Sequence, residues 1–532
     1  MKLGFLFGAG AEMGYGLPSG GQFALEIFRR DVSKSKEIFK TMRNNVKLDS
    51  SYAAEWLPSG FESKNISSFG KTVFQNIIKD TLEHNRDTIV RKLNDFQTIA
   101  EYHASDLKKK KGIDIDEVLT EITGTAPEDL SMKHILSFID EFKEGDVLFE
   151  SNYFSSLLTV YKLSPVFAEH QGDQTVNWQR IELKKILMSI IQLLVGALSE
   201  NLTKRINGGL FAKKDDEIDF FDDFGEILQL NYSASGLVGM DYLLDKRDPD
   251  LSNSLGKCLL FAQSIVEDIY SVVLDYKSLI DMYWHYLYTP STDWAKFCKI
   301  CIFLLNVRDY MVTEESLSKD KKNSLKEGFY GYYQQLNEAI KCNLFEVHGI
   351  ATTNYCNFIS EEIFKGIDGE NEKVVFLNGS TEMWYDPYLN RIGSEDELAH
   401  SDNHILVPLM FTQSGTKPMT SIQMSEKYVE TYNKWKEVDK IVIVGFGFGS
   451  DDEHINGILR TLIDSDNKKI VVVTRQKQSP IKNHQIVRQI AKKLRVSELK
   501  NISVIQMNSE GSPAESQKSL MQLLSDDKEH VN

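Results

Sequence analysis

The chain has 532 residues, of which 42% are hydrophobic, 26% charged and 11% aromatic, which is typical of a folded protein and not of a disordered one. This length exceeds what one hydrophobic core usually serves, so we expect two domains. The formal net charge of −16 disfavours a protein whose main function is to coat nucleic acid, because phosphate binding depends largely on lysine and arginine.

The hydrophobic segments predict neither a membrane span nor an export signal. The most hydrophobic one, 186–198, is well short of the roughly 20 residues that a membrane-spanning helix needs, so we expect a core helix. The run 3–11 is only weakly apolar and predicts a buried strand. Five cysteines without an export signal favour a reducing, cytoplasmic location. Cys298 and Cys301 have helical spacing and no second C-x-x-C pair, which predicts a buried helix face instead of a zinc site.

The pattern of apolar residues changes twice along the chain. Residues 2–7 predict a single buried strand, and residues 31–343 then show apolar residues at helical spacing with few strand signals. Within this long segment, helices are expected over 114–142, 178–202, 255–284 and 294–310, and polar connections over 212–224 and 316–324.

From residue 344 onward, short β-rich runs alternate with helices, which is typical of a parallel sheet with helical crossovers. The runs are FEVHGIATTNY, KVVFLNGS, ILVPLM, KIVIVGFGF, KIVVVT and ISVIQM. The strand at residues 2–7 would then be the first strand of the same sheet. We therefore predict one split α/β domain, residues 1–30 plus 344–532, interrupted by a mainly α-helical insertion over residues 31–343.

A glycine-rich loop, GAGAEMGYG at 8–16, follows the first predicted strand and precedes a helix expected to begin near Gly20. Such a loop can bring backbone N–H groups close to a pyrophosphate, and a helix N-terminus adds a favourable dipole. The dehydrogenase fingerprint G-x-G-x-x-G would need a glycine where Met13 stands. The spacing therefore disfavours an ordinary dehydrogenase.

The spacing instead resembles the GAG and G-[IL]-P loop of the sirtuin superfamily, at Gly8-Ala9-Gly10 and Gly16-Leu17-Pro18. Three more segments occur in the order that this family requires. TTNYC at 352–356 resembles its T-[TQ]-N-[YI]-D strand end, and FLNGS at 376–380 resembles its L-H-G-S segment. VGFGFGSDDEH at 444–454 resembles the G-Y-S-F-x-D-x-H-I segment of sirtuin-like prokaryotic proteins.

The resemblance implies a Rossmann-like, sirtuin-like sheet that binds NAD in an extended pose. Sirtuin deacylases also carry a zinc module with two C-x-x-C pairs, which this chain lacks. The chain therefore resembles the branch that hydrolyses NAD, many members of which are effectors of bacterial defence against phage. This branch implies NAD as the substrate, water as the nucleophile, no metal, and a transition state with oxocarbenium character.

The matched motifs imply roles for individual residues. Asn354 is expected to hold the ribose and the attacking water, because its amide both donates and accepts; the alternative is a cap for a helix beginning near Asn357. Asn378 stands where the family has its catalytic histidine, and an amide cannot exchange a proton near neutral pH. His454 is then either a substitute ligand contact or a structural helix-start residue, and His348 is expected in the core.

The other expected contacts with NAD come from the same four motifs. Glu12 is expected to orient a hydroxyl or a water, and Cys356 to be buried packing. The expected set is Gly8, Ala9, Gly10, Glu12, Gly16, Leu17, Pro18, Thr353, Tyr355, Gly379, Ser380, Gly445, Phe446, Gly447 and Asp452.

The leading hypothesis is an NAD+ glycohydrolase that depletes NAD as an anti-phage effector. The helical insertion is then the candidate for homo-oligomerisation, autoinhibition, or binding of a phage protein or a co-encoded defence protein. The alternative is a catalytically weak NAD- or ADP-ribose-binding module that regulates a partner, which Asn378 favours. Protein deacylation is the least supported function, since the zinc module is missing.

Overall fold

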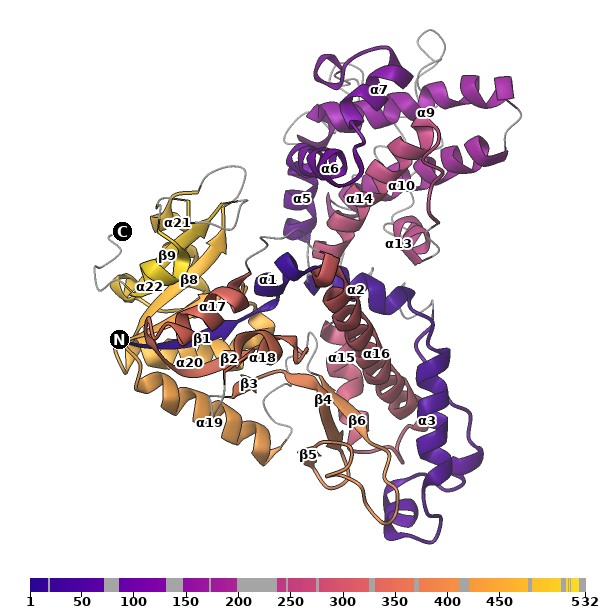
Figure 1. Cartoon of the computed structure of the whole chain (residues 1–532). Coiled ribbons are helices and arrows are strands. Elements are labelled where there is room, and N and C mark those ends of the chain that lie inside the picture. Colours follow the sequence, from indigo (N-terminus) through magenta and orange to yellow (C-terminus); the bar gives the residue numbers. More distant parts are fainter. Residues whose placement is uncertain are drawn as a thin grey trace. The chain divides into compact units, whose positions relative to one another are not determined.

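The computed structural model describes residues 1–17, 20–70, 86–130, 147–171, 174–198, 237–244, 247–273, 277–324, 331–367, 373–410, 421–476, 481–508, 513–514, 516 and 518–525. The chain divides into two compact units (Figure 1). The first comprises Met1–Ser19, Arg30–Phe69 and Tyr276–Asn532, and the second comprises Gly20–Arg29 and Gly70–Asp275. These boundaries differ from the predicted split, because 30–69 and 276–343 belong to the same unit as the strands.

The first unit contains a six-stranded, fully parallel sheet (Figure 1). Its order is β3-β2-β1-β7-β8-β9. The strands are β1 (Lys2–Phe7), β2 (Glu346–Thr352), β3 (Val374–Phe376), β7 (Lys440–Val444), β8 (Lys469–Arg475) and β9 (Ile502–Met507). β1 pairs with β2 on one side and with β7 on the other, so the prediction that the first strand joins partners beyond residue 344 is confirmed.

Helices precede or follow most strands of this sheet and make the chain α/β, as predicted. They are α17 (Tyr332–Lys341), α18 (Phe358–Ile363), α19 (Ile422–Lys436), α20 (Glu453–Asp464), α21 (Asn483–Leu494) and α22 (Leu520–Ser525). Leu6, Ile443 and Val472 of the sheet share one hydrophobic cluster with residues of α20 and α21. β1, β7 and β8 are nearly continuous apolar runs, which is what burial on both faces requires.

Trp435 fixes α19 against the sheet. Its side chain is fully buried, and its Nε1 donates a hydrogen bond to the Gly349 carbonyl oxygen at 3.1 Å. Gly4 of β1 leaves room for the indole, because a Cβ there would lie 2.6 Å from Trp435 Cδ1. The glycine is therefore required by this close approach.

The run ILVPLM does not join the parallel sheet, contrary to the prediction. Its strand β6 (Val407–Met410) pairs antiparallel with β4 (Gly379–Asp386), which also pairs with β5 (Arg391–Gly393) in a separate three-stranded sheet. Pro408 has no N–H to donate, so it suits β6 as an edge strand and not the interior of a parallel sheet. The sequence did not predict β4 or β5 as separate strands.

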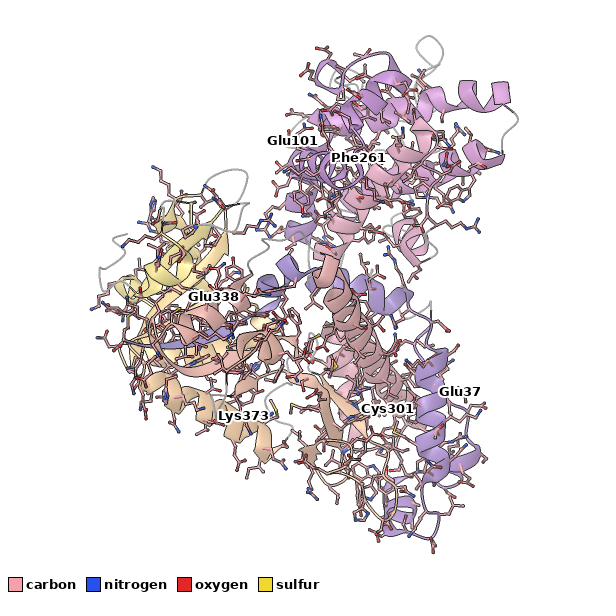
Figure 2. The ribbon with its side chains drawn as sticks, viewed as in Figure 1. Glu37, Glu101, Phe261, Cys301, Glu338 and Lys373 are labelled. Atoms are coloured by element: carbon pink, nitrogen blue, oxygen red, sulfur yellow. The ribbon has the colours of Figure 1, made fainter. Side chains whose placement is uncertain are left out.

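Long helices complete the first unit. They include α3 (Ser33–Asn45), α15 (Lys277–Trp284) and α16 (Trp294–Ser324), and α16 packs on α3, α15 and β6. Cys298 and Cys301 are buried on α16, as predicted, and Figure 2 labels Cys301. The polar connection predicted at 316–324 is wrong, because α16 continues to Ser324. Shorter pieces are α1 (Ala9–Glu12), η1 (Met13–Tyr15), η2 (Tyr52–Trp56), η3 (Phe61–Ser63), η8 (His285–Leu287), η10 (Ser450–Asp452) and η11 (Leu499–Asn501).

The second unit is helical throughout its described residues. It contains α2 (Gly20–Arg29), α5 (Arg86–Asn94), α6 (Phe96–Lys111), α7 (Ile115–Thr123), η4 (Pro127–Asp129), η6 (Val147–Glu150), α9 (Asn152–Gln171), α10 (Gln174–Leu198), α13 (Leu237–Leu244) and α14 (Ser254–Val273). α10 packs against α5, α9, α13 and α14. Among the described residues, no helix combines the length and apolarity that a membrane crossing requires.

Two helix predictions in this region need adjustment. The helix predicted over 114–142 ends at Thr123, where Gly124 adopts a left-handed conformation (φ +73°) and caps it. The helix predicted over 255–284 is two helices, α14 and α15, which belong to different units. The predicted connection at 212–224 lies outside the described residues.

Replacing Gly4 by alanine tests the approach of Trp435. We expect Gly4→Ala to destabilise the protein by about 1 to 3 kcal/mol, because the added methyl group overlaps a fully buried ring. The control is Gly457→Ala in α20, where a Cβ meets no atom within 4 Å and alanine favours the helix. Thermal unfolding should show a lower Tm for the first variant and an equal or higher Tm for the second. Equal effects of the two variants would contradict this explanation of Gly4.

Candidate functional site

The candidate site lies at the carboxyl ends of β1 and β7. β2 and β3 extend the sheet on one side of β1. The later strands β7, β8 and β9 extend it on the other side. The strand order therefore reverses between β1 and β7. In open α/β sheets this is the place where the loops diverge and ligands bind.

The two loops at this position are in close contact through glycines. The Gly8 N–H donates to the Val444 carbonyl oxygen and the Gly10 N–H to the Gly445 carbonyl oxygen, both at 2.9 Å. A Cβ on Gly8 would lie 2.7 Å from the Gly445 carbonyl oxygen, and Gly445 has φ +68° with Ala11 N only 2.2 Å from its would-be Cβ. These glycines therefore allow the loops to pack, and the Gly8 and Gly10 N–H groups are already hydrogen-bonded within the protein.

A buried polar cluster lies next to these glycines. Glu12, in α1, is only 3% exposed, and the Tyr333 hydroxyl donates to its Oε1 at 3.0 Å. Asn354, which follows β2, is 5% exposed. Its Nδ2 donates to the Gly8 carbonyl oxygen at 3.2 Å and approaches the Tyr333 hydroxyl at 3.5 Å. Three segments far apart in sequence thus place a carboxyl, a phenol and an amide together.

Asn354 is held by β2 and not by the helix after it. Its backbone N–H donates to Thr352 Oγ1 at 3.0 Å, and the Thr352 hydroxyl donates to the Phe7 carbonyl oxygen at 3.0 Å. The N-cap of α18 is Asn357, so Asn354 does not cap that helix. The structure therefore removes the capping alternative and leaves the Asn354 amide within the polar cluster.

The pKa of Glu12 is strongly perturbed. Burial raises it from 4.5 to about 8, although hydrogen bonds from Tyr333 and Asn354 oppose the shift. Burial also raises the pKa of Tyr333 well above its ordinary value, so this phenol remains a donor at neutral pH. A buried carboxyl that titrates near neutral pH can take up or release a proton, and such groups cluster at functional sites.

Tyr333 belongs to α17 and was not predicted as a site residue. Its ring stacks on Tyr15 with centroids 5.1 Å apart, and its backbone N–H donates to the Tyr15 hydroxyl at 3.0 Å. The Tyr15 hydroxyl donates in turn to Gln334 Oε1 at 2.6 Å. These contacts fix the Tyr333 hydroxyl on Glu12. In sequence, Tyr333 stands within a helical segment and carries no motif that could have revealed it.

A second polar group joins the ends of β3 and β7. Asn378 Nδ2 donates to Asp452 Oδ1 at 3.2 Å, and His454 Nε2 lies 3.2 Å from Asn378 Oδ1. Because an amide oxygen only accepts, Nε2 is the donor, which assigns the histidine tautomer. The ring of Tyr428 contacts His454 edge-on at 5.3 Å. The structure therefore brings Asn378, His454 and Asp452, which come from two of the motifs, into contact.

Several other residues that were expected to contact NAD have roles in packing or in the backbone conformation. Phe446 is buried in the hydrophobic cluster of the sheet, and Leu17 is also buried. Gly379 has φ +82°, and a Cβ there would lie 1.9 Å from the Leu409 carbonyl oxygen. Gly16 adopts φ +85° where it ends η1. Cys356 is fully buried, as predicted.

The remaining predicted contacts differ in exposure. Ala9 and Gly10 are exposed, Thr353 and Tyr355 are half-buried, and Ser380 is buried. At Gly447 a Cβ would meet no atom within 4 Å. Pro18 lies outside the described residues.

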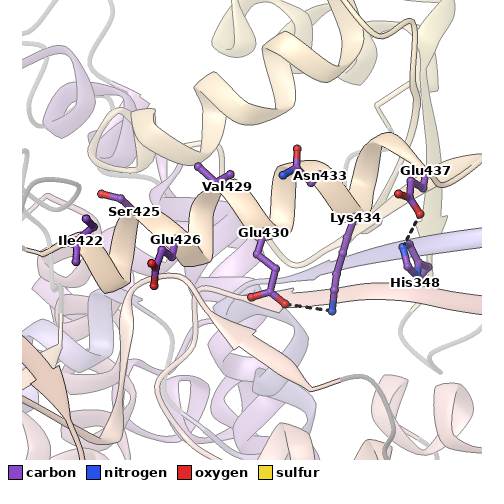
Figure 3. A pocket seen from close by; sticks show the side chains of 9 residues that line it. All are labelled: His348, Ile422, Ser425, Glu426, Val429, Glu430, Asn433, Lys434 and Glu437. Atoms are coloured by element: carbon purple, nitrogen blue, oxygen red, sulfur yellow. Dashed lines mark ion pairs between the residues drawn. The ribbon is translucent and has the colours of Figure 1, made fainter.

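His348 is not the core residue that the sequence predicted. It is 25% exposed, and its Nε2 lies 3.2 Å from Glu437 Oε2. It borders an open surface pocket of about 630 Å³ that is otherwise lined by α19 and Glu437 (Figure 3). This pocket contains none of the predicted catalytic or NAD-binding residues, so we do not assign it to the candidate site.

The Glu12 pKa predicts a pH dependence of stability. A carboxyl whose pKa is about 8 when folded and 4.5 when unfolded binds protons more tightly in the folded state, so stability falls as pH rises through this interval. Glu12→Gln removes this titration, so the stability of this variant should fall less than that of the native chain as pH rises. Thermal unfolding of both proteins between about pH 5 and 9 measures the difference, and parallel Tm profiles would contradict a raised Glu12 pKa.

No family model, curated protein or solved structure matches this chain. The function of the site is therefore inferred from its residues. They are a buried, titratable carboxyl with an amide and a phenol where the strand order reverses, and an amide–histidine–carboxylate group at the neighbouring strand ends.

Proposed function

We propose that this protein is an NAD+ glycohydrolase that cleaves the bond between nicotinamide and ribose. The observation that carries the proposal is the buried cluster of Glu12, Tyr333 and Asn354 at the point where the strand order reverses. Numbered within the parallel sheet alone, the strand order is 3-2-1-4-5-6, that of doubly wound dinucleotide-binding folds. A Rossmann-like sheet with the four sirtuin-like motifs at its carboxyl edge supports NAD as the ligand.

The reaction needs few chemical groups, because nicotinamide leaves as a neutral molecule. The glycosidic C1′–N bond breaks and its electron pair returns to the pyridine nitrogen, while a C1′–O bond forms with water. The products are ADP-ribose, nicotinamide and one proton. The protein therefore has to orient the water, exclude bulk solvent and receive that proton.

Glu12 and Asn354 suit these tasks. In its ionised form Glu12 accepts the proton that water loses, and burial keeps its pKa close to the working pH. Asn354 donates to one group and accepts from another, so it can hold the water or a ribose hydroxyl beside the carboxylate. The Tyr333 hydroxyl, fixed on Glu12, keeps the carboxyl oriented. In the proposed mechanism, these three residues perform the task that the sirtuin family assigns to a histidine at the position of Asn378.

The second polar group has a supporting role. Asn378 Oδ1 accepts from His454 and its Nδ2 donates to Asp452, so the amide orients both partners at the rim of the site. We assign His454 to substrate contact and Asn378 to positioning it.

The same contacts favour one second candidate function. Both polar ends of Asn378 are engaged, and an amide does not carry a proton between substrate and solvent. These contacts would be sufficient for a module that binds NAD or ADP-ribose without consuming it and regulates a partner, because such a module needs no proton transfer.

The cellular role that we propose follows from the sequence resemblance. An NAD-depleting enzyme would act in the cytoplasm as an anti-phage effector, and its activity would have to be restrained until infection. The second, helical unit is the candidate for homo-oligomerisation or for binding a phage protein or a co-encoded defence protein. Nothing in this role requires a membrane or nucleic acid.

NAD consumption by the purified full chain tests the proposal, with and without lysate of infected cells. We expect Asn354→Ala and Glu12→Gln each to lower the rate by about 10²- to 10⁴-fold, the usual effect of losing a positioned catalytic group. The control is Glu338→Gln, an exposed residue of α17 that should leave the rate unchanged. If the native chain consumes no NAD, yet NAD or ADP-ribose raises its Tm, the binding module is the better assignment.

The pH dependence of the reaction distinguishes Glu12 from other bases. Because the carboxylate is the active form, kcat/KM should rise with pH and level off above about pH 8, the pKa of the free enzyme. In Glu12→Gln the residual activity should lose this inflection. A native profile that is flat or falls between about pH 6 and 9 would rule out Glu12 as the base.

A further inference from the structure

A cluster of metal-ligand residues lies in the connection between β5 and β6, within the sequence H-S-D-N-H. It consists of His400, Asp402 and His404, each of which offers one ligand atom, and these atoms lie within 4.8 Å of one another. The cluster belongs to the small antiparallel sheet and shares no residue with the candidate active site. The sequence resemblance implied no metal, although the sequence contains this H-x-D-x-H spacing.

His404 is buried and held by a carboxylate. Its Nδ1 lies 2.7 Å from Asp386 Oδ2, and both side chains are 1% exposed. Asp386 is itself fixed, because its Oδ1 accepts from the backbone N–H groups of Tyr388 at 2.9 Å and Leu389 at 3.2 Å. The imidazole ring stacks on Tyr52 at 4.1 Å. Its orientation is therefore set by surrounding groups.

The second nitrogen of this ring is left without a partner among the described residues. His404 Nε2 is buried and makes no hydrogen bond with any residue that the structure describes. A buried polar atom without a partner costs free energy, and such atoms are uncommon in folded proteins. An imidazole that donates from one nitrogen to a carboxylate and leaves the other unpaired is the usual arrangement of a metal-ligating histidine. A cation would satisfy this nitrogen.

We propose that His400, Asp402 and His404 bind one divalent transition-metal ion of the zinc type. Two imidazoles and one carboxylate are a ligand set that zinc accepts, with water as the fourth ligand. In such a tetrahedron the ligand atoms are about 3.4 Å apart, given bonds of about 2.1 Å, so the widest separation in the cluster must shorten by up to about 1.4 Å. His400 is exposed and stacked on His404 at 4.4 Å, so its ring is the part that turns to close the site.

The position of the cluster predicts a structural role for the metal. The same loop is bound to the end of α3 and the residues just after it. Lys47 N donates to the Asp402 carbonyl oxygen, and Asn403 Nδ2 donates to the Asn45 carbonyl oxygen, both at 3.0 Å. The Ile405 N–H donates to the Tyr52 hydroxyl at 3.1 Å. A metal at this position would fasten the loop that leads into β6. The proposal is independent of the proposed reaction.

Metal binding by the full chain, stripped with a chelator and dialysed, tests this proposal. We expect one equivalent of zinc per chain, a higher Tm with zinc, and visible absorption bands typical of tetrahedral cobalt when Co²⁺ replaces it. His400→Ala and Asp402→Asn, which alter the two more exposed ligands, should each weaken zinc binding at least 10-fold. The matched control is His484→Ala, an exposed histidine of α21, which should bind zinc like the native chain.

Two results would overturn the proposal. One is the absence of stoichiometric zinc binding by the native chain, and the other is binding that His400→Ala and Asp402→Asn leave unchanged. Both variants retain Asp386 and His404, so circular dichroism and Tm without metal should match the native chain and show that they fold. NAD is not needed for any of these measurements, so their outcome does not depend on the active site.

Discussion

The pairing of β1 with strands that lie more than 300 residues later in the chain is the constraint on which the site depends. Lys2–Phe7 lies between β2 and β7, and its register sets Phe7 opposite Thr352 on one side and Val444 on the other. The loop after β1 therefore emerges beside both neighbouring loops, and Glu12 reaches Asn354. Such long-range parallel pairing is entropically costly and slow to form, and the continuous burial of three central strands offsets that cost.

The α/β class and the six parallel strands could be predicted because each strand is a compact apolar run, rich in β-branched residues in every strand except β1. Lys2–Phe7 was identifiable as a strand by its short apolar run ahead of the glycine-rich loop. The antiparallel sheet could not be predicted in this way, since β4 contains Met383 and Trp384 in no clear alternation and β6 reads as another buried run. The domain edges were also missed, because α3 and α16 read as helices in the sequence just as the helices of the second unit do, and a helical pattern does not specify which surface a helix covers.

The candidate site was predicted in part. Asn354, Asn378, His454 and Asp452 come from motifs at strand ends, and the structure brings the last three into contact and sets Asn354 beside Glu12. The pKa of Glu12 could not be read from sequence, because it depends on burial by residues that fold around it. Tyr333 was out of reach for the same reason, since only tertiary packing places α17 on the glycine loop. Gly8, Gly10 and Gly445 were expected to contact a ligand. In the structure they allow two loops to pack closely against each other.

The central claim is that the nicotinamide ribose of NAD binds at the buried carboxyl–amide–phenol cluster. The most direct measurement is an experimental structure of the full chain with a carbocyclic NAD analogue, whose bond to nicotinamide resists hydrolysis. We expect the ring that replaces the ribose to lie within hydrogen-bond distance of Asn354, with Glu12 on the side from which water attacks. An analogue bound elsewhere on the chain, with the Glu12 cluster unchanged, would contradict this assignment.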